Sequence, residues 1–337
     1  MPNLILLCSL LLACCVSQSA AAQPSSKPEP YNPLLLPASN VVRQVDLTVS
    51  DTARTREIPL RIYLPADTNP APLVLFSHGL GGTKDGCAYL GQHWAARGYV
   101  AVFLQHPGSD DSVWRNEPLA KRMSAMNQAA SAKNFLLRVE DVPAVLDQLA
   151  IWQDKIGHEL CGRLDLSKVG MSGHSFGAVT TQAVSGQSFP AGGQWLTDNR
   201  IKAAIAFSPS SPRRGDVKVA FGSVAIPWLL MTGTKDISPI GDIDVASRLA
   251  VYPALPAGNK YELVLKDGQH SAFADGALPG DSVRLNPNHH RVILALSTAF
   301  WDTHLLQDPA ARQWLQGEGP KSVLKPGDRW KTSTLGQ

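Results

Sequence analysis

One short stretch of the chain combines residue types that could activate a serine hydroxyl. Gly173-His174-Ser175-Phe176-Gly177 follows an apolar run that begins at Val169, and the small residues after it are typical of a helix start. A G-x-S-x-G sequence between a strand and a helix is typical of a nucleophile elbow, a strained turn that exposes the serine at the edge of a parallel sheet. The sequence therefore predicts Ser175 as a nucleophile. The alternative is an ordinary Gly/Ser turn.

A serine nucleophile needs a base to remove its proton and an acid to orient that base. Two residues downstream of Ser175 lie where strands are predicted to end. Asp236 comes shortly after the apolar stretch I-P-W-L-L-M, and His270 comes shortly after Y-E-L-V-L. In this type of sheet the chain order is nucleophile, acid and then histidine. The sequence predicts His270 as the general base and Asp236 as its orienting acid.

Other residues could fill these two positions. Asp216 follows the preceding predicted strand and is the main alternative to Asp236, which could itself merely end a strand. His289 and His290 also lie downstream of Ser175. They sit at a predicted helix start rather than at a strand end, so His270 is favoured.

Attack on a carbonyl creates an oxyanion, which is stabilised by N–H groups already aimed at it. The elbow supplies one donor, the backbone N–H of Phe176. A second donor is predicted in the glycine-rich stretch at 77–82, S-H-G-L-G-G, which follows another apolar run. The glycines would allow the backbone to approach a substrate closely, and the N–H of Leu80 is the candidate. The alternative is a plain glycine-rich turn.

The elements that must position these residues alternate between strands and helices. Such alternation implies right-handed crossovers and a mostly parallel sheet with helices on both faces, which is an α/β fold. In these sheets ligands bind at the carboxyl ends of the strands, where the residues above are predicted to lie. The predicted strands are 41–49, 57–64, 72–77, 99–104, 168–171, 201–207, 228–231 and 261–265, and the main predicted helices are 89–97, 135–156 and 290–306.

Four stretches of the chain carry a resemblance to a known family. They are S-H-G-L-G-G at 77–82, Q-H-P-G-S-D at 105–110, G-R-L-D at 162–165 and G-H-S-F-G at 173–177. With them the chain resembles the bacterial dienelactone-hydrolase-like and platelet-activating-factor-acetylhydrolase-like group of α/β-hydrolases, from about Arg61 to about Trp301. The resemblance implies the α/β-hydrolase fold and a serine hydrolase of short-acyl esters, with Leu80 and Phe176 as oxyanion donors.

The sequence departs from this group in two respects. True dienelactone hydrolases use a cysteine nucleophile, whereas this elbow carries Ser175, which argues against that substrate. The animal phospholipid acetylhydrolases take their acid after the strand that precedes the usual one. This second departure leaves Asp216 open beside Asp236.

The stretch between Pro107 and Ala132 leaves the predicted carboxyl edge of the sheet and is polar and amphipathic. It could form a lid or one wall of an acyl pocket, with Trp114, Met123 and Met126 as its apolar lining. The alternative is an ordinary surface helix that packs these residues on the core. We favour the lid.

The first residues are typical of a targeting segment. An apolar run at 4–16 is too short to span a membrane comfortably, and Ala20-Ala21-Ala22 resembles a cleavage site. Residues 1–22 are therefore predicted to be a signal peptide, and the protein to be exported, either secreted or periplasmic. The alternative is a lipoprotein signal with Cys14 lipidated, and a membrane partner is expected only in that case.

The rest of the chain is predicted to form one folded domain with two flanking segments. A Pro- and Ser-rich stretch at 23–40 indicates a flexible linker, residues 41–310 the α/β-hydrolase domain, and residues 311–337 a polar C-terminal tail. Cys87 and Cys161 are an even pair in a compartment expected to be oxidising. They are predicted to form either a disulfide or two buried free thiols.

Composition excludes several other classes of protein. The 337 residues are 44% hydrophobic and 18% charged, which is typical of a globular protein. The net charge of +3 is too small, and its cations too scattered, to indicate a nucleic-acid partner. No His, Cys and Asp cluster has metal-ligand spacing, and no nucleotide-binding glycine motif follows the first strand. We expect no metal, no cofactor and no nucleic acid, and a small ester or lipid as substrate.

These observations predict an exported, cofactor-independent serine ester hydrolase that works through an acyl-enzyme on Ser175. One alternative is a polyester hydrolase or cutinase-like enzyme, which an open site without a lid would favour. The same residues also support amide or thioester cleavage. From a different class, the chain could be a non-catalytic lipid- or surface-binding protein that keeps the fold, which predicts an incomplete Ser–His–Asp set.

Overall fold

The computed structural model describes residues 30–38, 41–190, 193–238, 240–241, 243–276 and 286–333. The predicted signal peptide, Cys14 and parts of the predicted linker lie outside these ranges. The described residues from Tyr31 onward belong to one compact unit. Within the described ranges, no helix has both the length and the apolar character needed to cross a membrane.

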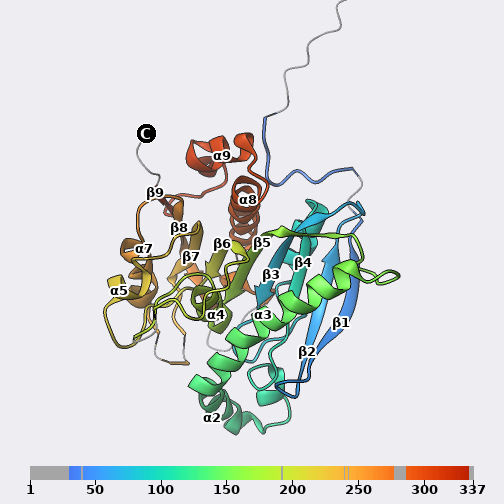
Figure 1. Cartoon of the computed structure of the whole chain (residues 1–337). Helices are drawn as coiled ribbons and strands as arrows, with labels where there is room; N and C mark the ends of the chain where they lie inside the picture. Colours follow the sequence, from blue (N-terminus) through green and yellow to red (C-terminus); the bar gives the residue numbers. More distant parts are fainter. Residues whose placement is uncertain are drawn as a thin grey trace, which may run out of the picture. The chain divides into compact units, whose positions relative to one another are not determined.

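A sheet organises the fold, and nine strands of the described chain contribute to it (Figure 1). The strand order is β1-β2-β4-β3-β5-β6-β7-β8-β9. The strands from β3 to β8 pair parallel with one another, whereas β1, β2 and β9 pair antiparallel at the two edges. The strands are β1 (Arg43–Asp51), β2 (Arg56–Leu64), β3 (Ala71–Ser77), β4 (Val100–Leu104), β5 (Leu164–His174), β6 (Ile201–Phe207), β7 (Trp228–Lys235), β8 (Lys260–Gln269) and β9 (Arg329–Ser333).

Helices from several parts of the chain cover the sheet and connect its strands. The α-helices of the described residues are α1 (Ala88–Ala96), α2 (Leu119–Ala129), α3 (Ala132–Asp154), α4 (Phe176–Val184), α5 (Val217–Phe221), α6 (Val245–Leu249), α7 (Val251–Ala254), α8 (Pro287–His304) and α9 (Pro309–Gln316). Three short 3₁₀ turns complete the described helical elements: η1 (Asp111–Val113), η2 (His270–Phe273) and η3 (Gly319–Ser322).

The central strands are apolar along their whole length because both of their faces are covered. β3 and β4 are buried at every residue. Successive side chains point to opposite faces, so Leu73 and Leu75 pack with α3 and α4, whereas Val74 and Phe76 pack with α1 and α8. Figure 1 shows α3 lying across one face of the sheet. This mostly parallel sheet with helices on both faces confirms the predicted fold class.

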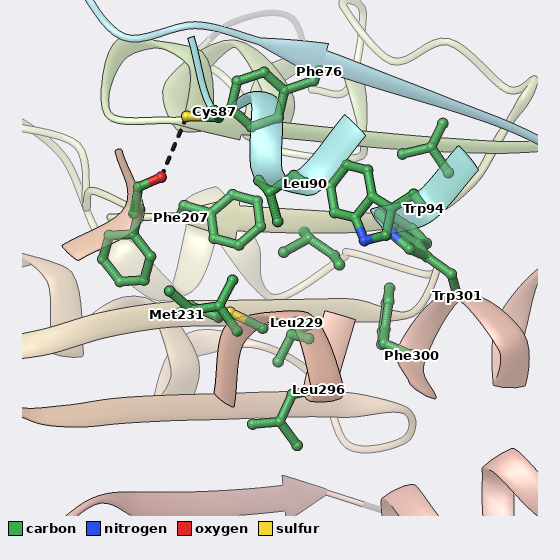
Figure 2. Packing of buried hydrophobic residues seen from close by; sticks show 14 of the residues in the cluster. Phe76, Cys87, Leu90, Trp94, Phe207, Leu229, Met231, Leu296, Phe300 and Trp301 are labelled. Carbon is green, nitrogen blue, oxygen red and sulfur yellow. Dashed lines mark hydrogen bonds between the residues drawn. The ribbon is translucent and has the colours of Figure 1, made fainter. Parts of the chain in front are cut away.

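Large aromatic side chains fill the core on the face covered by α1 and α8 (Figure 2). Trp94 of α1 and Trp301 of α8 meet edge to face, with ring centroids 6.0 Å apart, and both are buried. Edge-to-face pairs stabilise a core by about 1 kcal/mol beyond the area that they bury. The core therefore ties two helices that are distant in sequence to the strands that carry the candidate site.

The disulfide alternative for Cys87 and Cys161 is wrong, because both cysteines are free. Cys87 lies just before α1, on the carboxyl side of β3, and its buried thiol donates to the Phe273 carbonyl over 3.3 Å (Figure 2). Cys161 lies just before β5, at the amino end of that strand, and is partly exposed. β3 and β5 are neighbouring parallel strands, so these two positions lie at opposite ends of the strands and the thiols cannot meet.

The segment predicted as a C-terminal tail differs from the prediction, because it contains part of α9 and the whole of β9. α9 begins at Pro309, and the Asp308 carboxylate caps it by accepting from the amides of Ala310 and Ala311. β9 pairs antiparallel with β8, and its Trp330 ring stacks on Tyr261. The sequence R-W-K-T-S is polar because β9 is an edge strand with little buried surface.

Part of the predicted linker also packs on the domain. Tyr31 donates its hydroxyl proton to Asp302 at 2.7 Å, and Arg97 donates to the Leu35 carbonyl at 2.7 Å. His93 Nε2 lies 3.2 Å from the Pro33 carbonyl oxygen. These contacts hold the segment from Tyr31 to Leu35 against α1 and α8 instead of leaving it as a free spacer.

Candidate active site

Ser175 sits on a sharp turn between β5 and α4. Its backbone angles, φ 57° and ψ −115°, are strained for a residue with a side chain. The hydrogen bond from the Ser175 amide to the Phe207 carbonyl, 2.9 Å long, holds the turn against β6. Ser175 is partly exposed although its neighbours in the turn are mostly buried. The strained turn therefore presents the hydroxyl at the carboxyl edge of the sheet.

The structure brings Ser175, His270 and Asp236 into one hydrogen-bonded line. His270 Nε2 lies 2.8 Å from Ser175 Oγ, and His270 Nδ1 lies 2.7 Å from Asp236 Oδ1. The three residues follow β5, β7 and β8, whose carboxyl ends meet at the same edge of the sheet. A carboxylate only accepts hydrogen bonds, so Nδ1 carries the imidazole proton and Nε2 is free to accept the serine proton.

Asp236 is fully buried and remains ionised. Burial alone would raise the pKa of this carboxyl, but the hydrogen bond from His270 and the positive charge of Arg248 outweigh burial and lower its pKa to about 2. Thr232 donates its hydroxyl proton to Asp236 Oδ2 at 2.9 Å. The carboxylate thus keeps a negative charge behind His270 throughout the neutral pH range.

Arg248 of α6 contacts both Asp236 and His270, and the sequence analysis did not predict this. Its guanidinium is 1% exposed, lies 3.0 Å from Asp236 Oδ1 and donates to the Asp236 carbonyl at 2.7 Å. It also donates to the carbonyls of Ser208 and Pro209 and lies 3.1 Å from His270 Nδ1. Nothing in the short sequence D-V-A-S-R-L marks this arginine as buried.

His174 supports the histidine loop from inside the elbow. Its Nε2 lies 3.0 Å from the His270 carbonyl oxygen, and the two imidazole rings are 4.7 Å apart. Burial and the neighbouring His270 lower the pKa of His174 to about 3. The His174 ring is therefore neutral and donates its Nε2 proton to that carbonyl.

The alternative acid and bases lie elsewhere. Asp216 caps α5, where its carboxylate accepts from the Lys218 amide at 2.6 Å. His289 Nε2 lies 3.1 Å from the Lys266 carbonyl oxygen, and His290 Nε2 lies 3.0 Å from that of Ala274. None of these three side chains contacts Ser175 in the described structure, so the geometry favours Asp236 and His270.

The two predicted oxyanion donors belong to the loop after β3 and to the start of α4. Leu80 lies in the loop 77–82 after β3, and Phe176 is the first residue of α4. A Cβ atom at Gly79 would lie 3.4 Å from Ser175 Cβ, so this loop runs directly beside Ser175. Neither the Leu80 amide nor the Phe176 amide has a hydrogen-bond acceptor within the described ranges. Both N–H groups are therefore available to a substrate oxygen.

Trp114 and Met126, two of the three predicted pocket residues, contact the loop 77–82 at Gly81. Trp114 donates its indole proton to the Gly81 carbonyl at 2.8 Å, and a side chain at Gly81 would meet Met126 Sδ at 2.6 Å. Met123, one turn earlier on α2, is 44% exposed. Trp114 and Met126 thus form a wall beside the loop, whereas Met123 lies at the surface.

Gly177 is required by the close approach of α4 to β3. A Cβ atom at this position would overlap the carbonyl oxygen of Ser77, which is main chain inside the sheet and cannot move cheaply. We expect Gly177→Ala to lower the free energy of unfolding by about 3 kcal/mol. Urea denaturation would measure the loss. The matched control is Gly276→Ala, where a Cβ atom would meet nothing within 4 Å, and equal stability losses would contradict the prediction.

No group of three or more His, Cys, Asp or Glu side chains in the described ranges could hold a metal ion.

Comparison with known proteins shows a distant relationship to a curated protein. No family model matches the chain. The sequence is similar to platelet-activating factor acetylhydrolase of Cavia porcellus, with 26% identity over an alignment that covers 45% of this chain and 38% of the relative. The aligned region thus spans well under half of the relative's length. The bacterial dienelactone-hydrolase-like part of the resemblance stays a prediction. The distant similarity and the mostly parallel sheet agree in indicating α/β architecture.

Proposed function

We propose that this chain is a serine carboxylic ester hydrolase that acts on short-acyl esters. The observation that carries the proposal is the line of hydrogen bonds from Ser175 through His270 to Asp236, with distances of 2.8 Å and 2.7 Å. A protein that only bound lipids or surfaces would have no need for an ionised buried carboxylate behind a serine–histidine pair. The assembled set therefore supports catalysis over binding alone.

In the first half of the reaction, Ser175 Oγ attacks the ester carbonyl while His270 Nε2 takes the serine proton. The carbonyl oxygen becomes an oxyanion, which the amides of Leu80 and Phe176 stabilise. The C–O bond to the alcohol then breaks, and the departing alkoxide takes the proton from His270. This leaves an acyl-enzyme ester on Ser175 and a free alcohol.

In the second half, water enters the position that the alcohol has left. His270 takes a proton from this water, the hydroxide attacks the acyl carbonyl, and the same two amides stabilise the second oxyanion. The proton then returns from His270 to Ser175 Oγ as the acid departs. Throughout, Asp236 holds the imidazole in the correct tautomer and stabilises its cation.

A short acyl group is supported by the space around the oxyanion loop. Trp114 and Met126 contact Gly81, the residue after Leu80. They therefore limit the volume available to an acyl group whose carbonyl oxygen binds the Leu80 amide. The curated relative is named for the removal of an acetyl group, which is also short. Both observations favour acetyl and similarly small acyl groups over long chains.

Met126→Ala is expected to shift acyl preference toward longer chains. Removal of the thioether would open space beside Gly81, and each added methylene that fits an apolar pocket changes kcat/KM by about tenfold or more. We expect the ratio of kcat/KM for p-nitrophenyl hexanoate to that for the acetate to rise about tenfold. Met123→Ala, on the exposed side of the same helix, is the control. The same shift in both variants would contradict the pocket assignment.

The proposal is tested by measuring hydrolysis of p-nitrophenyl esters from acetate to palmitate, together with labelling by a fluorophosphonate. We expect the highest kcat/KM for the shortest esters and covalent attachment of one phosphonyl group to Ser175, located by mass spectrometry. An active enzyme labelled at another residue would overturn the assignment of the nucleophile. No activity and no labelling would overturn the hydrolase proposal and favour a binding protein.

We also propose that the protein is exported, with residues 1–22 removed as a signal peptide. Mass spectrometry of the protein isolated from its native cell would show a mature chain that begins at Gln23. A lipid-modified Cys14 at the N-terminus would replace the proposal with membrane anchoring, and an uncleaved chain would overturn export.

A further inference from the structure

Arg138 of α3 is fully buried beneath the loop 77–82. Its guanidinium donates to oxygens on three separate segments of the chain, and each of these oxygens belongs to an uncharged group. Nη2 donates to Ser77 Oγ at 2.9 Å and to the His78 carbonyl. Nη1 donates to Ser109 Oγ at 2.9 Å, and Nε donates to Thr180 Oγ1 at 3.1 Å.

These contacts join the two segments that carry the proposed oxyanion donors. The His78 carbonyl is in the loop, two residues before Leu80. Thr180 is on α4, and its hydroxyl donates to the carbonyl of Phe176 at 3.0 Å. The guanidinium carbon of Arg138 also lies 4.7 Å from the centroid of the Phe176 ring. One side chain therefore sets the position of the Leu80 amide relative to the Phe176 amide.

Arg138 makes no ion pair with a carboxylate in the described ranges. Asp141, one turn further along α3, already contacts Arg54 at 3.1 Å, Arg56 at 2.6 Å and His106 at 2.9 Å. Burial lowers the pKa of Arg138 to about 9, although the negative charges of Asp141 and Asp110 act in the opposite direction, and its guanidinium stays positively charged at neutral pH. A buried charge without an ionic partner is costly. An anion that forms nearby during the reaction would offset this cost.

A second Ser–His–Asp set holds Arg138 in place. Ser77 Oγ lies 2.9 Å from His106 Nε2, and His106 Nδ1 lies 2.9 Å from Asp141 Oδ2, with all three side chains fully buried. Since no substrate can reach Ser77, these three side chains orient Arg138 instead of acting on a substrate. Ser77 Oγ accepts from Arg138, donates to His106, and His106 donates to Asp141, so each proton has one defined place.

The same set also fixes the oxyanion loop directly. The His106 amide donates to His78 Nε2 at 3.0 Å, so the proton of the His78 ring lies on Nδ1. His78 Nδ1 then donates to the Gly79 carbonyl at 2.6 Å. Burial lowers the pKa of His78 well below its ordinary value, which keeps the ring neutral. The carbonyls of the loop are therefore held inward, away from a substrate.

We propose that Arg138 is a positioning residue of the oxyanion hole. It locks the Leu80 and Phe176 amides into one geometry and places an unpaired positive charge behind them, while the buried Ser77–His106–Asp141 set holds it in that orientation. The inference rests on the proposed ester hydrolase activity. It assigns a role in transition-state stabilisation to a residue that no substrate touches.

The test separates transition-state stabilisation from general loosening of the fold. The variants Arg138→Met and Arg138→Lys are assayed with p-nitrophenyl acetate and with an alkyl trifluoromethyl ketone. In that inhibitor Ser175 Oγ bonds to the ketone carbon, the serine proton passes to His270, and the ketone oxygen becomes an oxyanion. Its inhibition constant therefore reports on the oxyanion hole without bond cleavage.

We expect Arg138→Met to lower kcat about 100-fold and to weaken the inhibitor by the same factor, with KM changed less than about threefold. Arg138→Lys keeps the positive charge but cannot contact all three segments. Its kcat and its inhibitor affinity should therefore each be about tenfold higher than those of Arg138→Met. Arg97→Met is the matched control, because it also removes an arginine whose guanidinium donates to oxygens of other segments. Arg97 donates to Asp302 and to the Leu35 carbonyl, both at 2.7 Å, and these contacts lie on the α1 and α8 side of the fold. Arg97→Met should lower Tm and leave kcat and the inhibition constant unchanged.

Three outcomes would overturn the inference. The first is an Arg138→Met variant with the wild-type kcat, and the second is a variant with a lower kcat but unchanged inhibitor binding. The third is an Arg97→Met variant that loses as much kcat as Arg138→Met at the same loss of Tm. If Arg138→Met does not fold, Ser77→Ala and Thr180→Val each remove one acceptor of Arg138, together with the bond to His106 or to the Phe176 carbonyl. Each should lower kcat and inhibitor affinity together by about threefold to tenfold. Unchanged values for both would overturn the inference.

Failure of the inference is distinguishable from failure of the proposed function. An inactive wild-type chain, or activity that survives Ser175→Ala, overturns both. Activity that depends on Ser175 but is the same in every Arg138 variant overturns only the role of Arg138.

Discussion

Replacing Ser175 with alanine is expected to lower kcat for p-nitrophenyl acetate by about 10⁵-fold while KM stays within a few-fold of the wild-type value. Without Oγ there is no protein nucleophile, and the remaining rate comes from water attack at an oxyanion hole that is still in place. KM changes little because the Ser175 hydroxyl contributes to the transition state rather than to ground-state binding. Steady-state kinetics at pH 7 measure both quantities.

A double-variant series tests whether Ser175 and His270 act as one unit. His270→Ala alone should cost about as much as Ser175→Ala, and the double variant should cost no more, because either change removes the same step. Ser188→Ala is the control, since Ser188 only shares a hydrogen bond with Ser223 at the surface. Additive losses in the double variant, or an equal loss in Ser188→Ala, would show that the two residues do not share one mechanism.

The parallel sheet and the grouping of Ser175, Asp236 and His270 could be predicted because both depend on local sequence order. Apolar runs mark buried strands, and parallel strands bring their carboxyl ends to one edge. Polar residues that follow β5, β7 and β8 must therefore lie close together. The strand boundaries were less predictable, since β5 and β8 extend beyond their apolar runs into polar residues.

The residues that support the site were harder to predict because their partners are distant in sequence. Arg138 did carry a usable signal: it lies three residues after Phe135 and four before Val142, on the apolar face of a predicted helix. A charge in that position indicates a buried polar contact. Arg248 had no such signal, because α6 is only one turn long and its contacts with Asp236 and His270 depend on how two loops fold.

β9 and Cys161 show a second reason why prediction failed. β9 exposes most of its residues, so it lacks the hydrophobic alternation that marks a strand. The cysteine count could not exclude a disulfide, because only the three-dimensional arrangement places Cys87 and Cys161 at opposite edges of the sheet. In both cases the deciding information was tertiary.

Asp236→Asn is expected to lower kcat by about 10⁴-fold with little change in the fold. In the wild type the ionised carboxylate accepts the Nδ1 proton of His270, which leaves Nε2 free to take the serine proton. An asparagine amide can instead donate to Nδ1. Arg248 Nη2, which already lies 3.1 Å from Nδ1, can donate there as well. Both donors favour the tautomer with the proton on Nε2, and that tautomer cannot act as a base toward Ser175.

Asp216→Asn is the matched control. The sequence offers Asp216 as the alternative to Asp236, but its carboxylate caps the start of α5. Asp216→Asn should keep kcat within about twofold and lower stability by about 1 kcal/mol or less, the scale of a helix cap that retains an acceptor. Circular dichroism and thermal unfolding of both variants would show that each is folded before kcat is compared. A large loss of kcat in Asp216→Asn with normal activity in Asp236→Asn would move the acid to Asp216. Large losses in Asp236→Asn alone would show that His270 depends on Asp236 for its tautomer, with Arg248 making the wrong tautomer more favourable once the carboxylate is gone.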